Sequence, residues 1–289
     1  MRQQLAGRTV LITGPARGIG AETARQLARR GARLALVGLE PERLAALARE
    51  LGEGHVWLEC DVTDQAAVDR AVAESVRALG RLDVVVANAG IASNGTVAVT
   101  PVRALVRTIE VNLIGVVRTV SSTLPHLTAA RGYYLLVSSA AALSALPAMS
   151  AYAASKGGVE LFAHALRLEL AHKGVDVGVI HPAWIDTDLV RDQQRDLQSF
   201  NEMLRHLPGP FGTITSVEAC AAAFVDAIEH RRRKIYVPRS LAPLAAIRSL
   251  FMTRLSDLVM GRHARRIVPA AEREVEALGR AFGEHSVER

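Results

Sequence analysis

Two residues four positions apart, Tyr152 and Lys156, carry the side chains that are best suited to acid–base chemistry. In a helix this spacing puts both side chains on one face, within reach of each other. A phenol with an ordinary pKa of about 10 is a poor acid or base at neutral pH, but a neighbouring ammonium stabilises the phenolate and lowers that pKa. Such a tyrosine can exchange a proton with an alcohol or ketone oxygen. Ser139, expected at the carboxyl end of a strand, would bring a hydroxyl to the same oxygen. Alternatively, Tyr152 and Lys156 are an exposed pair on a helix surface, and Ser139 is a turn or capping residue.

A glycine-rich turn near the start of the chain is a candidate anion-binding site. It reads Thr13-Gly14-Pro15-Ala16-Arg17-Gly18-Ile19-Gly20, after a strand-like run and before a helical one. Glycine lets the backbone approach a pyrophosphate, and the free amides and dipole of a helix start favour negative charge. The spacing Gly-x-x-x-Gly-x-Gly differs from the Gly-x-Gly-x-x-Gly dinucleotide fingerprint. A tight strand-to-helix connection is the alternative.

The first 240 residues alternate apolar strand-like runs with segments of helical period, a pattern that predicts parallel strands joined by crossover helices. Several runs are continuously apolar, as expected for strands that helices cover on both faces. The predicted fold is therefore α/β, a Rossmann-type doubly wound seven-stranded parallel sheet with a C-terminal helical extension. Strands are expected at Thr9–Thr13, Arg33–Val37, His55–Cys60, Leu82–Ala87, Tyr133–Ser138, Val175–His181 and Lys234–Val237. Helices are expected at Gly18–Arg30, Pro41–Leu51, Gln65–Leu79, Pro101–Ala130, Ala151–His172 and Ser216–His230.

The glycine turn resembles the cofactor loop of the short-chain dehydrogenase/reductase family, in its single-domain branch with Tyr-x-x-x-Lys chemistry. Further motifs follow in that family's order: Asp61-Val62, then Asn88-Ala89-Gly90, Asn112, and Ser139 ahead of Tyr152-x-x-x-Lys156. The resemblance covers about residues 6–237. It implies an NAD(P)(H)-dependent oxidoreductase that transfers a hydride between the nicotinamide and a secondary alcohol or ketone.

The resemblance also implies a role for each matching residue. The catalytic set is Asn112, Ser139, Tyr152 and Lys156, in which Lys156 also holds the nicotinamide ribose and Asn112 anchors a water that continues the proton relay. Ser138 is then structural. The segment after the sixth strand carries Ala183 where the family has glycine. Alanine disfavours a positive φ, so a left-handed backbone is not expected at this position. The implied cofactor-binding residues are Thr13, Gly14, Arg17, Gly18, Ile19, Gly20, Gly38, Asp61, Val62, Asn88, Ala89, Gly90, Tyr152, Lys156, Pro182, Ile185 and Thr187.

The choice between the two dinucleotides depends on the end of the second strand, Val37-Gly38-Leu39-Glu40. Gly38 stands where NAD-preferring relatives carry aspartate, and Leu39 stands where NADP-preferring relatives often carry arginine. Arg17 matches a basic position of NADP-dependent relatives, whereas Glu40 would repel a phosphate if it pointed inward. The balance favours NADP(H) over NAD(H).

Composition narrows the classes of protein. With 49% hydrophobic and 22% charged residues in 289, the chain has the composition of a globular protein with a sizeable core. Its two cysteines exclude a disulfide framework, and its scattered histidines predict no metal site. Aromatic residues at 4% argue against nucleic-acid binding. The sequence from Met1 leaves no room for a signal peptide before the first strand, so a cytoplasmic location is expected.

The chain is expected to form a catalytic domain, 1–240, and a basic amphipathic helical extension, 241–289. The net charge is +6, and residues 231–289 carry 13 Lys or Arg and 6 Asp or Glu, so 13 − 6 = +7 lies in this tail. The extension is expected to pack on the domain or a second subunit, to cover the substrate site, or to touch an anionic membrane surface.

No single residue identifies the small-molecule substrate, which is expected to lie among three segments. These are Ala140–Met149, Trp184 and the segment Asp188–Phe211, which is expected to be a mobile lid; they predict an apolar, bulky alcohol or ketone. The apolar face of Leu161, Phe162, Ala165 and Leu168 predicts a homo-dimer or homo-tetramer, although it could also be core in a monomer. A redox-silent nucleotide-binding or sensing protein is the alternative function. An epimerase or dehydratase on a nucleotide sugar is disfavoured by the loop spacing.

Overall fold

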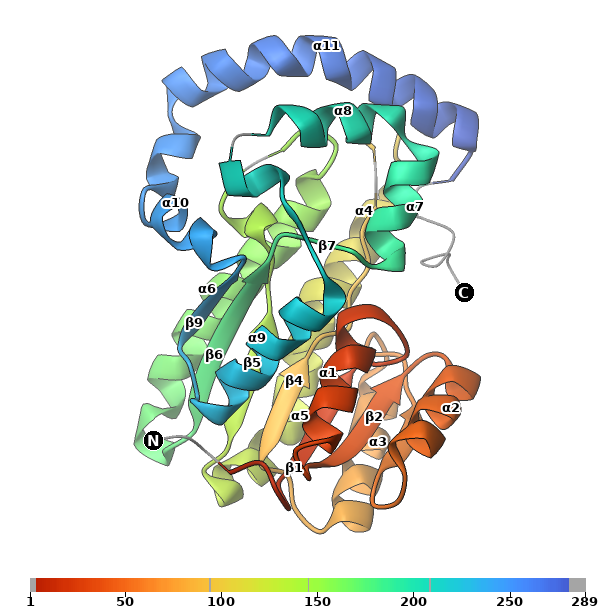
Figure 1. Ribbon diagram of the computed structural model, residues 1–289, viewed down its shortest axis with the longest axis vertical. Helices are drawn as coiled ribbons and strands as arrows, with labels where there is room; N and C mark the ends of the chain where they lie inside the picture. Colours follow the sequence, from red (N-terminus) through yellow and green to blue (C-terminus); the bar gives the residue numbers. More distant parts are fainter. Residues whose placement is uncertain (1–3, 94, 145, 208, 281–289) are drawn as a thin grey trace.

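The computed structural model describes residues 4–280, apart from positions 94, 145 and 208. Its centre is a seven-stranded sheet in the order β3-β2-β1-β4-β5-β6-β9, and every neighbouring pair is parallel (Figure 1). The predicted doubly wound α/β fold is confirmed. The strands are β1 (Thr9–Thr13), β2 (Arg33–Gly38), β3 (Val56–Glu59), β4 (Val84–Ala87), β5 (Tyr133–Val137), β6 (Asp176–Pro182) and β9 (Lys234–Val237).

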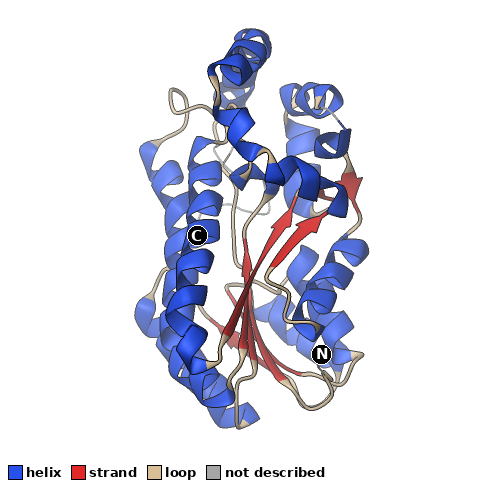
Figure 2. Ribbon diagram, turned by 90° about the vertical axis from the view of Figure 1, so that its left-hand side faces the viewer, coloured by secondary structure: helices blue, strands red, loops and turns tan. Residues whose placement is uncertain are grey.

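Helices cover both faces of the sheet and form two separate apolar cores (Figure 2). One core joins the sheet to α1 (Gly18–Ala28), α2 (Pro41–Leu51) and α9 (Val217–Glu229). The other joins it to α3 (Gln65–Leu79), α5 (Gly115–Ala130) and α6 (Ser150–Leu170). Strands buried on both faces need apolar side chains in both directions, which explains the uninterrupted apolar runs of β4 and β5.

The long crossover helix between β4 and β5 differs from the prediction of a single helix over Pro101–Ala130. It divides into α4 (Val102–Ile109), a π-helical turn (Glu110–Ile114) and α5. The apolar period continues through the turn, so the sequence carries no sign of the wider winding. Such turns are frequent at functional sites, and this one contains the candidate catalytic residue Asn112.

Beyond the carboxyl ends of the strands lie a small parallel pair, β7 (Trp184–Ile185) with β8 (Ile214–Thr215), and the helices α7 (Asp188–Asp196) and α8 (Gln198–His206). The extension that follows β9 consists of α10 (Ala242–Ala246), a short helical turn (Arg248–Met252) and the long α11 (Arg254–Leu278). Figure 1 shows α11 lying across the end of the molecule, beyond α8. Among the described residues, no helix is long and apolar enough to cross a membrane.

Candidate active site

The predicted site residues converge on one edge of the sheet, where the parallel strands end. Ser139 follows β5, and Tyr152 and Lys156 lie in the first two turns of α6. Asn112 lies in the π-helical turn between α4 and α5. The predicted cofactor-binding residues occupy the ends or following turns of the neighbouring strands: Thr13, Gly14, Arg17, Gly18, Ile19 and Gly20 at and after the end of β1, Gly38 at the end of β2, Asp61 and Val62 after β3, Asn88, Ala89 and Gly90 after β4, and Pro182, Ile185 and Thr187 at and after the end of β6.

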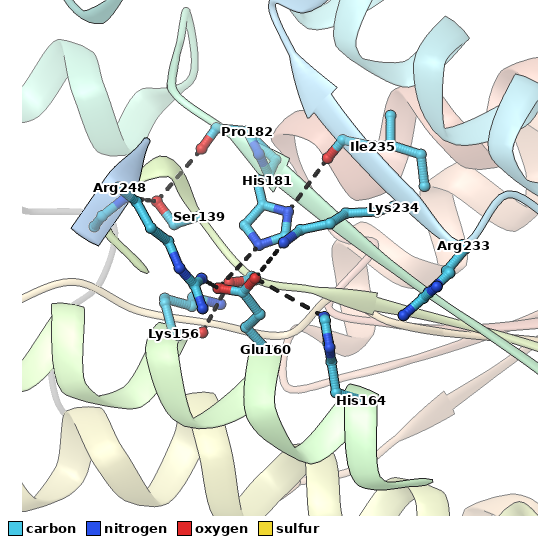
Figure 3. A network of polar contacts seen from close by, with 12 residues as sticks. Ser139, Lys156, Glu160, His164, His181, Pro182, Arg233, Lys234, Ile235 and Arg248 are labelled. Atoms are coloured by element: carbon cyan, nitrogen blue, oxygen red, sulfur yellow. Dashed lines mark hydrogen bonds and ion pairs between the residues drawn. The ribbon is translucent and has the colours of Figure 1, made fainter. Parts of the chain in front are cut away.

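Ser139, Tyr152 and Lys156 form a contiguous group. The Lys156 Nζ lies 5.8 Å from the centre of the Tyr152 ring and donates a hydrogen bond of 3.0 Å to the carbonyl oxygen of Val137. The Ser139 hydroxyl interacts with the Tyr152 phenol and donates weakly, at 3.4 Å, to the Pro182 carbonyl. Figure 3 shows Ser139 beside Pro182, with Lys156 reaching toward the same strand ends. A phenol, a hydroxyl and an amine are thus held at one place.

Burial dominates the protonation of this group. It raises the pKa of the Tyr152 phenol, and the hydrogen bond with Ser139 counteracts this only in part. The expectation that Lys156 leaves Tyr152 with a lowered pKa is therefore wrong for this structure, because the loss of solvent outweighs the favourable contacts. Burial also lowers the pKa of Lys156 to about 8. The amine can therefore gain and lose a proton near neutral pH.

Asn112 connects the segment after β4 to α6. Its Nδ2 donates to the carbonyl oxygen of Ile91 at 2.9 Å and to the Ser155 hydroxyl at 3.1 Å, and its Oδ1 accepts from the Ile91 amide at 2.8 Å. Gly90 lies against the same group, since a Cβ added there would be 3.2 Å from Asn112 Oδ1 and 3.4 Å from Lys156 Nζ. The structure therefore brings together Gly90, Asn112 and Lys156, which lie far apart in the sequence.

Ser138 ties the end of β5 to the helix of the candidate site. Its hydroxyl donates to the carbonyl oxygen of Lys156 at 2.8 Å, and its amide donates to the Ile180 carbonyl at 2.9 Å. These contacts are those of a structural residue.

The glycine turn leaves its backbone open for a ligand. No side-chain cap closes the start of α1, since Arg17 at the N-cap makes no such hydrogen bond. A Cβ on Gly20 would lie 2.7 Å from both the Asn88 Nδ2 and the Gly14 carbonyl oxygen, so only glycine fits there. Thr13 Oγ1 in turn accepts hydrogen bonds from the amides of Asn88 and Ala89, at 3.0 and 3.1 Å, which fixes the ends of β1 and β4 together.

The segment after β6 faces this turn. A Cβ on Gly18 would lie 3.2 Å from the Thr187 Cγ2, and the Thr187 amide donates to the Ile185 carbonyl at 2.7 Å. Ala183 is not among the described residues with positive φ, so the glycine-to-alanine difference requires no left-handed backbone. The two halves of the predicted dinucleotide site therefore lie next to each other.

The carboxylate of Asp61 has a partner that sequence reasoning missed. Burial favours a higher pKa, but hydrogen bonds from Thr63 and the ion pair with Arg107 outweigh it and lower the pKa of Asp61. The Arg107 Nη2 lies 3.0 Å from Asp61 Oδ2. Arg107 comes from α4, 46 residues away, and no local pattern could have indicated the contact. Val62 packs against α5, where a Cβ on Gly115 would be 2.8 Å from its Cγ2.

Arg17 and Glu40 meet beside the end of β2. The Arg17 guanidinium forms a bidentate ion pair with the Glu40 carboxylate. The same carboxylate lies 3.2 Å from the Arg43 Nε. The Nη1 of Arg17 is buried and has no hydrogen-bond partner. Gly38 has room for a side chain, since an added Cβ would meet only ordinary contacts at 3.7 Å. Two guanidinium groups around one carboxylate leave a local excess of positive charge.

A second polar network, also missed from the sequence, surrounds Glu160 one turn after Lys156 (Figure 3). Glu160 accepts from Lys234 Nζ at 2.5 Å and from Arg248 Nη1 at 2.7 Å. The His181 Nε2 lies 3.6 Å from the same carboxylate, and the His181 ring stacks on Tyr236. His181, predicted to be a strand-end residue, is fully buried directly before Pro182.

Comparison with known proteins agrees with this geometry. A sequence model described as short chain dehydrogenase matches residues 8–198. The chain belongs to the short-chain dehydrogenase family. It is 35% identical over 215 residues to a 3-oxoacyl-(acyl-carrier-protein) reductase of Bos taurus, covering 74% of this chain and 89% of that protein.

Two further relatives carry other substrate names. The chain is 36% identical over 207 residues to cis-4-hydroxycyclohexanecarboxylate dehydrogenase of Sinomonas cyclohexanicum, which covers 69% of this chain and 82% of that protein. It is 32% identical over 248 residues to 11-beta-hydroxysteroid dehydrogenase 1A of Arabidopsis thaliana, covering 82% of this chain and 70% of that protein. Membership of the short-chain dehydrogenase family supports an oxidoreductase, and the family generally uses NAD(P)(H), acts on small molecules and is commonly oligomeric.

Proposed function

We propose that this short-chain dehydrogenase transfers a hydride between NADP(H) and a secondary alcohol or ketone of a hydrophobic substrate. The observation that carries the proposal is the convergence of Ser139, Tyr152 and Lys156 beside Gly90 and Asn112, at the edge of the sheet that also holds the glycine turn. A redox-silent binding protein would need none of the first three side chains in one group.

In the proposed reduction, Tyr152 is the proton donor. Its phenol stays protonated at neutral pH because burial raises its pKa, so it can give a proton to a carbonyl oxygen as the carbonyl carbon gains a hydride. The Ser139 hydroxyl holds that oxygen by a hydrogen bond. Lys156, with its pKa near 8, then returns a proton to the phenolate. The hydride itself is the chemistry that the nicotinamide supplies when bound.

Asn112 fits a positioning role in this scheme. Both N–H groups of its amide are already donated, to Ile91 and Ser155, which leaves only its oxygen for a further contact. The predicted water relay would therefore have to use that oxygen or the backbone. The hydrogen bonds that exist hold the segment after β4 against α6, next to Lys156.

The residues at the glycine turn suit a dinucleotide. The open start of α1 and the glycines of the turn are arranged for a pyrophosphate. Asp61, kept ionised by Thr63 and Arg107, could then act in the cofactor binding that the family resemblance implies. The buried, unpartnered Nη1 of Arg17 favours a further anion near the end of β2, which supports NADP(H) over NAD(H).

Replacing Glu40 with Gln is expected to tighten NADPH binding about tenfold and to leave NADH binding nearly unchanged. The substitution removes the negative charge that competes with a 2′-phosphate for Arg17, and a charged hydrogen bond contributes about 1.5–3 kcal/mol. Fluorescence titration with each dinucleotide measures the ratio of the two Kd values. Glu42→Gln, two residues along on α2, is the matched control. An equal change for both dinucleotides would contradict the assigned phosphate position.

The rate of ketone reduction is expected to fall as the pH rises through about 8. Lys156 must be protonated to resupply Tyr152, and burial lowers its pKa to about 8, so the competent form of the free enzyme is lost above that pH. The pH profile of kcat/KM for reduction measures this limb. In Lys156→Arg, whose guanidinium stays charged, the remaining activity should no longer fall in that range. An identical limb in the arginine variant would assign the titration to another group.

A hydrophobic substrate is proposed because apolar side chains cluster in the helices α7 and α8, which follow the segment that faces the glycine turn. Trp184, which directly follows Ala183, packs edge-on against Phe200 of α8, with 5.1 Å between ring centres. Val190, Leu197 and Leu204 are buried in the same cluster. The experiment that tests the proposed function is a panel of apolar ketones with NADPH and NADH, followed by absorbance of the reduced nicotinamide. Dinucleotide binding without oxidation by any ketone would favour the redox-silent alternative.

The proposed enzyme is a homo-oligomer. Leu161 and Leu168 of α6 are 68% and 79% exposed, and Val102 and Val106 of the adjacent α4 are 73% and 56% exposed. Phe162, which was predicted to share this face, is instead partly buried and packs against the core. Large apolar side chains exposed on two helices that pack together support a subunit interface on this side.

A further inference from the structure

The C-terminal extension lies outside the part of the chain that defines the family. The family match ends at residue 198 and the sheet ends with β9 at Val237, yet 25 residues of α11 follow. A helix of that length spans roughly 37 Å, enough to cross the whole end of the domain. Figure 1 shows α11 crossing this end of the molecule, over α8.

The extension begins with an ion pair to the catalytic helix. Arg248 Nη1 donates to Glu160 Oε2 at 2.7 Å, one turn after Lys156 on α6 (Figure 3). The Glu160 side chain is only 3% exposed, while that of Arg248 is 42% exposed. Lys234 contacts the other oxygen of the carboxylate at 2.5 Å, so Glu160 stays neutralised when Arg248 is removed. The contact with Arg248 therefore fastens the extension without being needed for the charge balance of the core.

The far half of α11 contacts two different segments through two glutamates. Glu272 Oε1 accepts from Thr96 Oγ1 at 2.7 Å, in the segment between β4 and α4. Glu274 Oε2 accepts from the Ser199 hydroxyl at 2.6 Å and from the Ser199 amide at 3.1 Å, at the start of α8. Residues two apart in a helix point about 200° away from each other. The two carboxylates therefore reach to opposite sides of α11.

Further contacts join α11 to the segment between β4 and α4 and to the α7–α8 segment. Val275 is buried with Leu197, Phe200 and Leu204 of the α7–α8 segment, and its Cγ1 would lie 3.3 Å from a Cβ added to Gly95. Arg280 Nη2 lies 2.5 Å from Asp196 Oδ2 at the end of α7. One short stretch of α11 thus packs on both segments at once.

Both bridged segments lead directly to the candidate active site. The 91–101 segment begins after Gly90, which borders Lys156, and the α7–α8 segment begins after Thr187, which faces the glycine turn. Val99 of the first segment and Met203 of the second are partly buried and pack against the cluster that contains Val275. A substrate bound between these segments would contact more or less apolar surface according to their spacing.

From these contacts we infer that the C-terminal extension is the specificity-determining element for the bulky apolar part of the substrate. It acts by holding the 91–101 segment and the α7–α8 segment at a fixed spacing, from an anchor on the catalytic helix. The inference rests on the proposed function, because it assigns the substrate class for that reaction. Binding energy from a remote part of the substrate that is equal in the ground and transition states changes KM and leaves kcat unchanged.

The test compares β-tetralone, a bulky apolar ketone, with acetone in the full-length chain. In the double variant Glu272→Ala with Glu274→Ala, the KM for β-tetralone should rise about tenfold, while its kcat, the KM for acetone and the Kd for NADPH stay within about twofold. Glu276→Ala removes the same charge from an exposed position of α11 and should behave like the wild type. Arg248→Met should raise the β-tetralone KM in the same direction, with Arg262→Met, an exposed arginine of α11, as its control.

The outcomes separate this inference from the proposed function. An unchanged β-tetralone KM in the double variant, or an equal rise for both ketones, would overturn the role of the extension. If the double variant does not fold, an unchanged β-tetralone KM in Arg248→Met would overturn it. Reduction of acetone but not of β-tetralone by the wild type would also do so. Failure of the wild type to reduce any ketone of the panel counts against the proposed function instead.

Discussion

Replacing Tyr152 with Phe is expected to reduce ketone turnover by a factor of about 10²–10⁴ or more, with dinucleotide affinity almost unchanged. The variant loses only the hydroxyl that interacts with Ser139, which removes the proposed proton donor and keeps the ring beside Lys156. General acid catalysis by a positioned group contributes a factor of this size. Steady-state kcat with a reactive ketone and fluorescence titration with NADPH measure the two effects separately.

Tyr236→Phe is the matched control for this variant. Tyr236 lies in β9, and its ring stacks on His181, which is part of the network around Glu160. The proposed reaction does not use the Tyr236 hydroxyl. The control should retain turnover within about twofold of the wild type. Comparable turnover by Tyr152→Phe and the wild type would show that another group donates the proton.

Replacing Lys156 with Met is expected to have two opposite effects: turnover falls by a factor of about 10²–10⁴, and the thermal stability rises. Burial lowers the pKa of Lys156 to about 8, so folding places a charged ammonium where it is disfavoured at neutral pH. A shift from 10.5 to about 8 corresponds to an unfavourable contribution of about 3 kcal/mol at most. The Val137 carbonyl loses its hydrogen bond in the variant, which offsets part of the gain. A rise of a few degrees in Tm remains.

The sign of the pH dependence gives a second readout for Lys156→Met. Between pH about 8 and 10.5 the unfolded lysine binds more protons than the folded one, so the stability of the wild type rises with pH across this window. The advantage of the variant should therefore be full below pH about 8 and shrink above it. Calorimetric Tm values of both proteins against pH measure the difference. Lys173→Met, at an exposed position, should alter neither Tm nor turnover. A Tm below that of the wild type at neutral pH would contradict the account.

The sheet was predictable because its signals are local. Runs such as Val84–Ala87 and Tyr133–Val137 are apolar throughout, and only strands covered on both faces require that. The π-helical turn at Asn112 was not predictable, since the apolar period runs through it unchanged. The extension was predicted as helical and amphipathic, but its path over α8 follows from contacts such as Glu274 with Ser199, which are 75 residues apart.

In the candidate site, too, contacts within one element were predictable and contacts between distant segments were not. Tyr152 and Lys156 share one helix, so their proximity follows from their spacing. The partners of Asp61 and Glu160 come from residues 46 and 88 positions away, Arg107 and Arg248, and a single sequence holds no sign of them. The direction of the Tyr152 pKa was wrongly predicted for a related reason. Solvent exclusion depends on tertiary packing, which local spacing does not report.

Transfer of deuterium from the cofactor to the product tests the central claim most directly. The wild type is incubated with NADPH that carries deuterium at the transferable position of the nicotinamide, together with a ketone of the panel, and the product is analysed by mass spectrometry. The account predicts an alcohol with one deuterium on the carbinol carbon from the wild type and from Tyr236→Phe, and almost none from Tyr152→Phe. A wild-type protein that binds NADPH but delivers no deuterium to any ketone would contradict it.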